Sequence, residues 1–248
     1  MWRKLLEYGI AIVILGLLWE VAALVLHTPA LPGPFEVVSQ PAILFNAAMG
    51  RHFAISLWRV AASLAFGVAL GLPLGLLLGR ERVLDRLSAP LIFITYPIPK
   101  IVFLPILMIV LGLGNLSKIT LITIIVFFQI LVTARDAARA VPEESVFSIR
   151  SLGAGKWQTY RHIIFPASLP SVFTALRIST GTAIAVLFLA ESFATEDGLG
   201  YLILNAWSSL NYSQMFAAIL ALGLMGVLIY ELLELAERKM CPWAEVEQ

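Results

Sequence analysis

The sequence predicts an all-α protein that crosses a membrane about six times. Its composition is 60% hydrophobic and only 13% charged, with a mean hydropathy of +0.90. Soluble domains carry about 25% charged residues, so this chain has too few to cover a water-exposed surface. Six separate stretches are also long enough to cross the hydrocarbon core, which takes about 20 mostly apolar residues. Together these observations predict a polytopic membrane protein.

The six predicted spans follow one another along a single domain that covers residues 1–248. They are residues 8–26, 55–79, 88–111, 116–134, 171–195 and 215–235. Arg3 and Lys4 precede the first apolar run, as in a secretion signal, but the run is long for one and five more spans follow. We therefore expect the first span to be retained.

Two connections between the predicted spans are longer than the others. Residues 27–52 contain PALPGPFEVV, whose prolines predict an extended turn followed by a short helix at the membrane surface. Residues 135–170 mix charged and apolar side chains. Lys and Arg concentrate on the side that holds both termini and this second loop, whereas residues 196–213 have none. The positive-inside rule therefore predicts that the termini and the 135–170 loop are cytoplasmic.

The sequence of the 135–170 loop predicts two short helices joined by a glycine turn. Pro142 suits the first turn of a helix, where its missing N–H would have no intrahelical partner anyway. The first helix has an apolar edge at three-residue spacing, formed by Val146, Ile149 and Leu152. Gly153 should interrupt this helix, and a second helix should run over residues 156–164 until Pro166 ends it. The product is a helical hairpin with an exposed Gly-Ala-Gly tip that another protein's backbone can approach closely.

Two other interpretations of this loop have to be weighed. An amphipathic hairpin lying on the membrane surface would show a similar pattern. The letters GAGKW also suggest a phosphate loop, but that motif needs Gly where Arg150 stands and Ser or Thr where Trp157 stands. The chain therefore has no visible nucleotide site. If ATP and Mg²⁺ are used, a separate subunit has to bind them.

Four stretches resemble the membrane subunits of bacterial ABC importers that depend on a binding protein, in the nitrate, sulfonate and taurine branch. In the loop segment RSLGAGKWQTYRHIIFPASLP, Gly153, Ile163 and Pro166 stand at the fixed positions of that family's coupling-loop motif. The other stretches are LPGPFEVV at 31–38, YPIPKIVFLPILMIVLGLGNLSK at 96–118 and ESFATEDGLGYLI at 191–203. One departure is that the acidic-Ala-Ala triplet usual at the motif's start aligns with Phe147, Ser148 and Ile149.

The resemblance implies a type I ABC importer permease fold in a bacterial inner membrane. It implies a non-catalytic subunit that works with two ATPase subunits, with a periplasmic or lipid-anchored binding protein, and with a second copy of itself. ATP binding would draw the coupling hairpins together and open the path outward, and hydrolysis would reset it. The residues expected to couple to the ATPase are Arg150, Ser151, Leu152, Gly153, Ala154, Gly155, Lys156, Trp157 and Gln158. No cofactor, metal or nucleic acid is expected on the chain itself.

Charged and helix-breaking residues within the spans mark a candidate translocation path. Lys100 lies in the third span among Pro97, Pro99 and Pro105, and broken backbone at membrane depth is tolerated where it lines protein or water. An intramembrane ammonium is costly, so Lys100 either faces a path for an anion, pairs with a carboxylate, or precedes the true start of the span. Glu191, in the outer part of the fifth span, is either a gate or a structural partner.

A glycine stripe runs along the second span. Gly67, Gly71, Gly75 and Gly79 repeat at four-residue spacing, and such stripes permit close contact between membrane helices. The contact lies either between two copies of the chain or within one chain. Packing within one chain is favoured, because every tightly packed bundle needs such faces.

An ion-coupled carrier and a membrane enzyme are the alternatives to an importer subunit. An ion-coupled carrier predicts inverted repeats and a polar site near the midplane, and it would leave the 135–170 hairpin unexplained. A membrane enzyme would need a nucleophile–base or metal constellation, which the lone Cys241 and three scattered histidines do not supply. For the importer, we expect a sulfonate or taurine-like solute first and nitrate second. A vitamin precursor such as a pyrimidine or riboflavin is the alternative.

Overall fold

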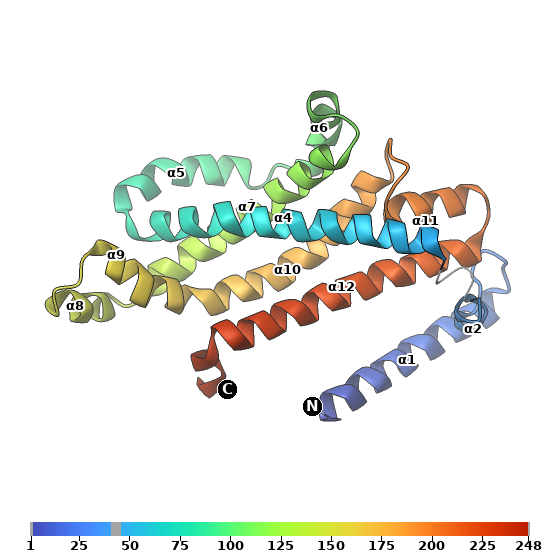
Figure 1. Cartoon of the computed structure of the whole chain (residues 1–248), viewed down its shortest axis with the longest axis horizontal. Coiled ribbons are helices and arrows are strands. Elements are labelled where there is room, and N and C mark those ends of the chain that lie inside the picture. Colours follow the sequence, from blue (N-terminus) through green and yellow to red (C-terminus); the bar gives the residue numbers. More distant parts are fainter. Residues whose placement is uncertain (1, 41–45, 248) are drawn as a thin grey trace. The chain divides into compact units, whose positions relative to one another are not determined.

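The computed structural model describes residues 2–40 and 46–247, and none of these residues forms a β-strand (Figure 1). The predicted all-α class is therefore confirmed. The elements are α1 (Trp2–Leu26), α2 (Pro34–Val38), α4 (Ala47–Arg80), α5 (Arg82–Thr95), a 3₁₀ turn η1 (Lys100–Phe103), α6 (Leu104–Leu111), α7 (Asn115–Ala140), α8 (Glu143–Ser151), α9 (Lys156–Thr159), a π-helical turn η2 (Tyr160–Ile164), α10 (Phe165–Glu191), α11 (Leu199–Ser208), α12 (Tyr212–Met240) and a 3₁₀ turn η3 (Pro242–Glu247).

The contacts within the chain divide it into two compact units. Unit 1 comprises Met1–Ser56 and Glu191–Leu224, and unit 2 comprises Leu57–Ala190 and Met225–Gln248. The long helices α4, α10 and α12 each contribute residues to both units. The expectation of a single permease domain stays a prediction.

Five helices of the described chain are long and apolar enough to cross a membrane, and a sixth span exists if the bent pair α5–α6 counts as one. The five segments are Leu6–Leu26, Ala47–Arg80, Asn115–Ala140, Lys156–Glu191 and Tyr212–Met240. Most of these helices extend several residues beyond the predicted spans. The predicted number of about six spans is consistent with the fold.

The third predicted span, residues 88–111, is not one straight helix. α5 ends at Thr95, and its axis makes an angle of 81° with that of the following segment Lys100–Leu111. Pro97 and Pro99 lie in the break. Proline supplies no N–H to a helix and disfavours helical backbone in the residue before it, so two prolines two residues apart stop α5. The helix resumes only through the short turn η1.

The helix that contains the fifth predicted span, residues 171–195, begins and ends earlier than that span. Helical structure runs without interruption from Lys156 to Glu191, so the expectation that Pro166 ends the second loop helix was wrong. The π-helical turn Tyr160–Ile164 lies directly before Pro166, and such turns rearrange the backbone hydrogen bonds of a helix. The missing N–H of Pro166 is therefore accommodated instead of breaking the helix.

The glycine stripe packs α4 against α7 within unit 2. A Cβ atom on Gly71 would lie 2.9 Å from the carbonyl oxygen of Phe127, and one on Gly75 would lie 2.6 Å from that of Leu131. These separations leave no room for any side chain. The glycines therefore bring the two backbones into contact, which confirms the interpretation as packing within one chain.

Two short helices belong to unit 1. α2 begins at Pro34, after the proline-rich turn, and confirms the helix predicted there. α11 was not predicted and lies within residues 196–213, the segment that contains no Lys or Arg. Its start at Leu199 and the next residue, Gly200, are both buried. Burial of one face explains why the segment is helical although its sequence carries few helix-starting residues.

Candidate functional site

The turn of the 135–170 loop is a compact helical hairpin in unit 2. α8 ends at Ser151, and the N–H of Gly153 donates to the carbonyl oxygen of Arg150 at 2.9 Å. Gly153 has a φ of +86°, a conformation that favours glycine. The N–H of Gly155 donates to Oε1 of Gln158 at 2.7 Å, which caps the start of α9. The predicted glycine turn therefore joins the two helices.

The tip of this hairpin exposes large apolar side chains. Leu152 is 87% exposed, Trp157 is 74% exposed and Phe147 is 60% exposed. Val146, which the sequence places on the same apolar edge as Leu152, is 1% exposed. The predicted edge is thus divided, with Val146 buried within unit 2 and Leu152 exposed at its surface. Exposed large apolar side chains next to polar residues are typical of a surface that contacts another molecule.

Ion pairs attach both helices of the hairpin to the corner between α4 and α5. Glu143, at the start of α8, lies 3.3 Å from Nη2 of Arg80, and Lys156, at the start of α9, lies 3.4 Å from Glu81. Arg80 Nη1 also donates to the carbonyl oxygen of Val141 at 3.2 Å. The hairpin and the end of α4 are therefore positioned together.

Lys100 lies in the proline break and contacts aromatic rings instead of an acid. Its Nζ donates to the carbonyl oxygen of Tyr96 and lies 4.8 Å from the ring centroid of Phe128 on α7 and 5.1 Å from that of Tyr96. Among the residues the structure describes, no carboxylate forms an ion pair with Lys100. The alternative in which a carboxylate neutralises Lys100 is therefore not observed. Whether Lys100, Pro97 and Pro99 line a path stays a prediction.

Glu191 is fully buried in unit 1 at the N-terminus of α11. Its two carboxylate oxygens accept the hydroxyl of Ser56 at 2.9 and 2.8 Å, and Oε2 also accepts the N–H of Gly200 at 2.9 Å. The Ser56 hydroxyl oxygen in turn accepts the N–H of Leu199 at 2.8 Å. The first N–H groups of a helix lack intrahelical partners and carry the positive end of the helix dipole. Glu191 and Ser56 satisfy them.

Sequence reasoning did not find the partners of Glu191. His52, one of the three scattered histidines, accepts the N–H of Gly198 through its Nδ1 at 3.0 Å, directly before α11. His52 and Ser56 are separated by four residues and therefore share a face of α4. That spacing was the one sequence feature that could have indicated that His52 and Ser56 act together. Nothing local to the sequence connects the two residues with Glu191.

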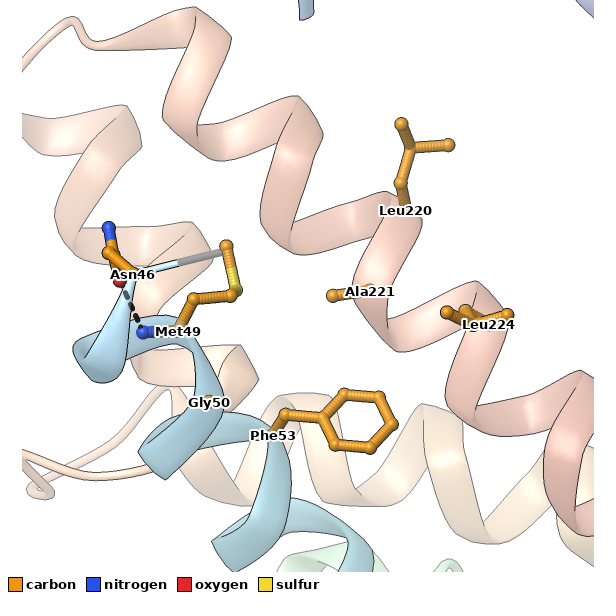
Figure 2. Close-up of a pocket in the computed structure, with 7 residues that line it drawn as sticks. All are labelled: Asn46, Met49, Gly50, Phe53, Leu220, Ala221 and Leu224. Carbon is orange, nitrogen blue, oxygen red and sulfur yellow. Dashed lines mark hydrogen bonds between the residues drawn. The ribbon is translucent and has the colours of Figure 1, made fainter. Parts of the chain in front are cut away.

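Unit 1 also contains an apolar pocket between the first turns of α4 and the middle of α12, with a volume of about 550 Å³. Its lining consists of Asn46, Met49, Gly50, Phe53, Leu220, Ala221 and Leu224. Figure 2 shows Met49 and Phe53 extending from α4 toward α12. The side-chain oxygen of Asn46 accepts the N–H of Met49 at 2.6 Å and so caps α4. The pocket offers no charged group to a polar solute.

Comparisons with known proteins agree on one family of transport proteins. Residues 71–241 match the family described as "Binding-protein-dependent transport system inner membrane component". The taurine transport system permease protein TauC of Escherichia coli (strain K12) is 30% identical over 245 residues, which cover 96% of this chain and 89% of TauC. The nitrate import permease protein NrtB of Synechocystis is 27% identical, with 96% and 90% covered. The formylaminopyrimidine transport permease protein ThiX of Halalkalibacterium halodurans is 27% identical, with 96% of each chain covered.

A solved structure shares the fold. A chain of the methionine ABC transporter MetNI in an inward-facing conformation superposes with a TM-score of 0.64 over 79% of this chain and 95% of that chain, at 21% identity. This likeness concerns the fold, which is that of a type I ABC importer permease.

The chain belongs to the family of binding-protein-dependent transport system inner membrane components. It is a multi-pass permease subunit of an ABC importer. This family membership favours the importer interpretation over the ion-coupled carrier and the membrane enzyme.

Proposed function

We propose that this permease moves a small anion into the cell, with a sulfonate or taurine-like solute first and a nitrate-like solute second. The observation that carries the proposal is the ammonium of Lys100, which lies at a proline break in a membrane segment with no carboxylate paired to it in the described chain. Intramembrane charges usually face a cavity or a partner. An anion that passes Lys100 would be such a partner.

Another cation within a predicted span, that of Arg177, has a different environment. Arg177 on α10 pairs with Glu237 of α12 through Nη1 at 2.5 Å and lies over the ring of Tyr230. Its charge is neutralised inside unit 2. Lys100 instead has a carbonyl oxygen and two aromatic faces around its ammonium, contacts that stabilise a cation without cancelling its charge. This difference supports a role for Lys100 in passage of the solute.

The hairpin turn from Arg150 to Gln158 is proposed as the surface that contacts the ATPase. Two exposed apolar side chains, Leu152 and Trp157, would enter a groove of that subunit, and aromatic anchors of this kind often dominate binding energy. The ion pairs of Glu143 and Lys156 with the α4–α5 corner would transmit movement of the hairpin to the membrane helices. ATP and Mg²⁺ are assigned to the ATPase, because this chain has no phosphate loop.

The assembly is proposed to contain two copies of this chain, two ATPase subunits and a binding protein on the outer side. The distribution of Lys and Arg supports cytoplasmic termini and a cytoplasmic hairpin. ATP binding would bring the two hairpins together and favour an outward-open state, and hydrolysis would favour the inward-open state. Each state is then selected by the partner that binds it more tightly.

The test is solute uptake and ATP hydrolysis by the complete transporter in proteoliposomes. A panel of taurine, an alkanesulfonate, nitrate and a formylaminopyrimidine is offered with the cognate binding protein. We expect a sulfonate to stimulate both activities. Stimulation by the formylaminopyrimidine alone would assign the solute class of ThiX instead.

Lys100→Met tests the path. The change removes the charge and retains most of the side-chain volume, and we expect at least a tenfold loss of uptake with normal assembly. Lys239→Met, at the end of α12 on an exposed position, is the matched control. Uptake by Lys100→Met equal to that of Lys239→Met would exclude the proposed role.

A further inference from the structure

A small polar cavity lies in unit 2 where α4 ends and α5 begins, next to the junction of α7 and α8. Its volume is about 410 Å³, far above the roughly 10–15 Å³ that one water needs. Its lining consists of Leu78, Gly79, Arg80, Arg82, Asp85, Arg139 and Glu143. Three of these seven residues are arginines, and one of them, Arg80, also pairs with Glu143 at the start of the hairpin.

The first carboxylate in the cavity is already neutralised. Oδ1 of Asp85 accepts Nε of Arg135 at 2.5 Å, and Oδ2 accepts Nη2 of Arg139. Two guanidinium groups thus contact this one carboxylate. Arg139 contributes to this contact through one nitrogen, and its side chain remains 52% exposed. Donors of Arg139 therefore remain for another ligand.

The second carboxylate in the cavity is that of Glu143, and positive charge remains in excess after it is counted. Glu143 faces Arg80 at 3.3 Å, and its side chain is 59% exposed. Arg82 is exposed, and within residues 2–40 and 46–247 its guanidinium has no hydrogen-bond or ion-pair partner. Three guanidinium groups, those of Arg80, Arg82 and Arg139, thus share the cavity with two carboxylates. The ligand that suits this arrangement is an anion.

We propose that this cavity binds the phosphate of an anionic phospholipid headgroup. A guanidinium presents two parallel N–H donors that match the oxygens of a phosphate. Arg82, with no partner of its own, would make the main contact, and the remaining donors of Arg139 and Arg80 would complete it. Basic pockets between membrane helices at a cytoplasmic surface are suited to such headgroups.

The surroundings of the cavity favour a lipid over free phosphate. Val83 and Leu87 on α5, next to Arg82 in sequence, are 73% and 69% exposed, and none of the residues of α5 is buried. An acyl chain could lie along this apolar surface while the headgroup occupies the cavity. The placement at the inner leaflet depends on the cytoplasmic orientation proposed above.

The cavity also contacts the hairpin that is proposed to meet the ATPase. Arg80 links the cavity to the start of α8 through Glu143. A phosphate bound to Arg80 and Arg82 would hold the α4–α5 corner against α8 in one arrangement. Anionic lipid should therefore increase the coupling of the hairpin to the membrane helices.

The test measures lipid retention by the complete transporter, a readout that does not depend on transport. Spin-labelled phosphatidylglycerol and phosphatidylcholine are compared on the wild type, on Arg82→Gln and on Arg161→Gln. Arg161 is an exposed arginine of η2 outside the cavity and loses the same charge. We expect the wild type and Arg161→Gln to retain phosphatidylglycerol over phosphatidylcholine, and Arg82→Gln to lose at least threefold of that preference.

Two further arms complete the test. Arg82→Lys keeps the charge but loses the two-pronged donor, so it should retain an intermediate preference, and thermal unfolding checks that each variant is folded. Inorganic phosphate at millimolar concentration should not displace the lipid. Equal retention by Arg82→Gln and Arg161→Gln would overturn the proposal. So would displacement by inorganic phosphate, which would assign the cavity to the free ion.

Discussion

The carboxylate of Glu191 occupies the space where a side chain on Gly198 would have to lie. Gly198 has a φ of +115°, and a Cβ atom there would overlap the carboxyl group of Glu191. The same carboxyl group accepts the N–H of Gly200 and the hydroxyl of Ser56. The N-terminus of α11 and the end of α10 are therefore fixed to each other by one buried acid and one residue without a side chain.

This relationship predicts that Gly198→Ala destabilises unit 1. The φ and ψ of Gly198 lie in a region that is essentially restricted to glycine, where another residue costs about 1–3 kcal/mol, and overlap with Glu191 adds to this. Thermal unfolding in detergent measures the effect. Gly223→Ala is the control, because a Cβ at Gly223, in the middle of α12, meets no atom within 4 Å. Equal unfolding temperatures for the two variants would contradict the prediction.

Glu191→Gln separates a structural role from a role in the path. A glutamine retains one oxygen for the N–H of Gly200 but presents an NH₂ group where the second oxygen accepts the Ser56 hydroxyl. We expect a loss of about 1–3 kcal/mol in the free energy of unfolding, the usual effect of an unpaired buried polar group, with uptake per folded transporter within twofold of the wild type. Lost uptake at an unchanged unfolding temperature would instead place Glu191 in the path.

The sequence allowed the hairpin to be predicted but not the Glu191 cluster, and the difference is physical. The turn at Gly153 depends on residues within a few positions, so its chemistry is visible locally. Ser56 and Glu191 are 135 residues apart, and only tertiary packing brings them together. Pro166 misled the prediction because a π-helical turn accommodates it. At the third span the proline signal was correct, but the 81° bend was not foreseen.

The contact between α4 and α7 predicts that Gly75→Ala is destabilising although alanine favours helices. The added Cβ would lie 2.6 Å from the carbonyl oxygen of Leu131 and 2.7 Å from Cβ of Ala134, so the helices would have to separate. Overpacking of this kind costs about 1–3 kcal/mol. Gly50→Ala on the same helix meets no atom within 4 Å and should gain up to about 1 kcal/mol from helix propensity. Chemical unfolding in mixed micelles compares the two, and a stabilised Gly75→Ala would refute close packing.

The exposed tip of the hairpin predicts a variant that uncouples the transporter without unfolding it. Leu152→Asp places a charge where a partner's apolar groove would have to receive it, and loss of a central anchor costs about 2 kcal/mol or more of binding. Because Leu152 is 87% exposed in this chain, the unfolding temperature should not change. Binding of the purified ATPase and its stimulation by solute-loaded binding protein are the measurements. Val146→Asp provides the contrast, since Val146 is 1% exposed and a buried charge should unfold α8. Normal ATPase binding by a folded Leu152→Asp would move the contact away from the tip and would favour a hairpin that lies on the membrane surface.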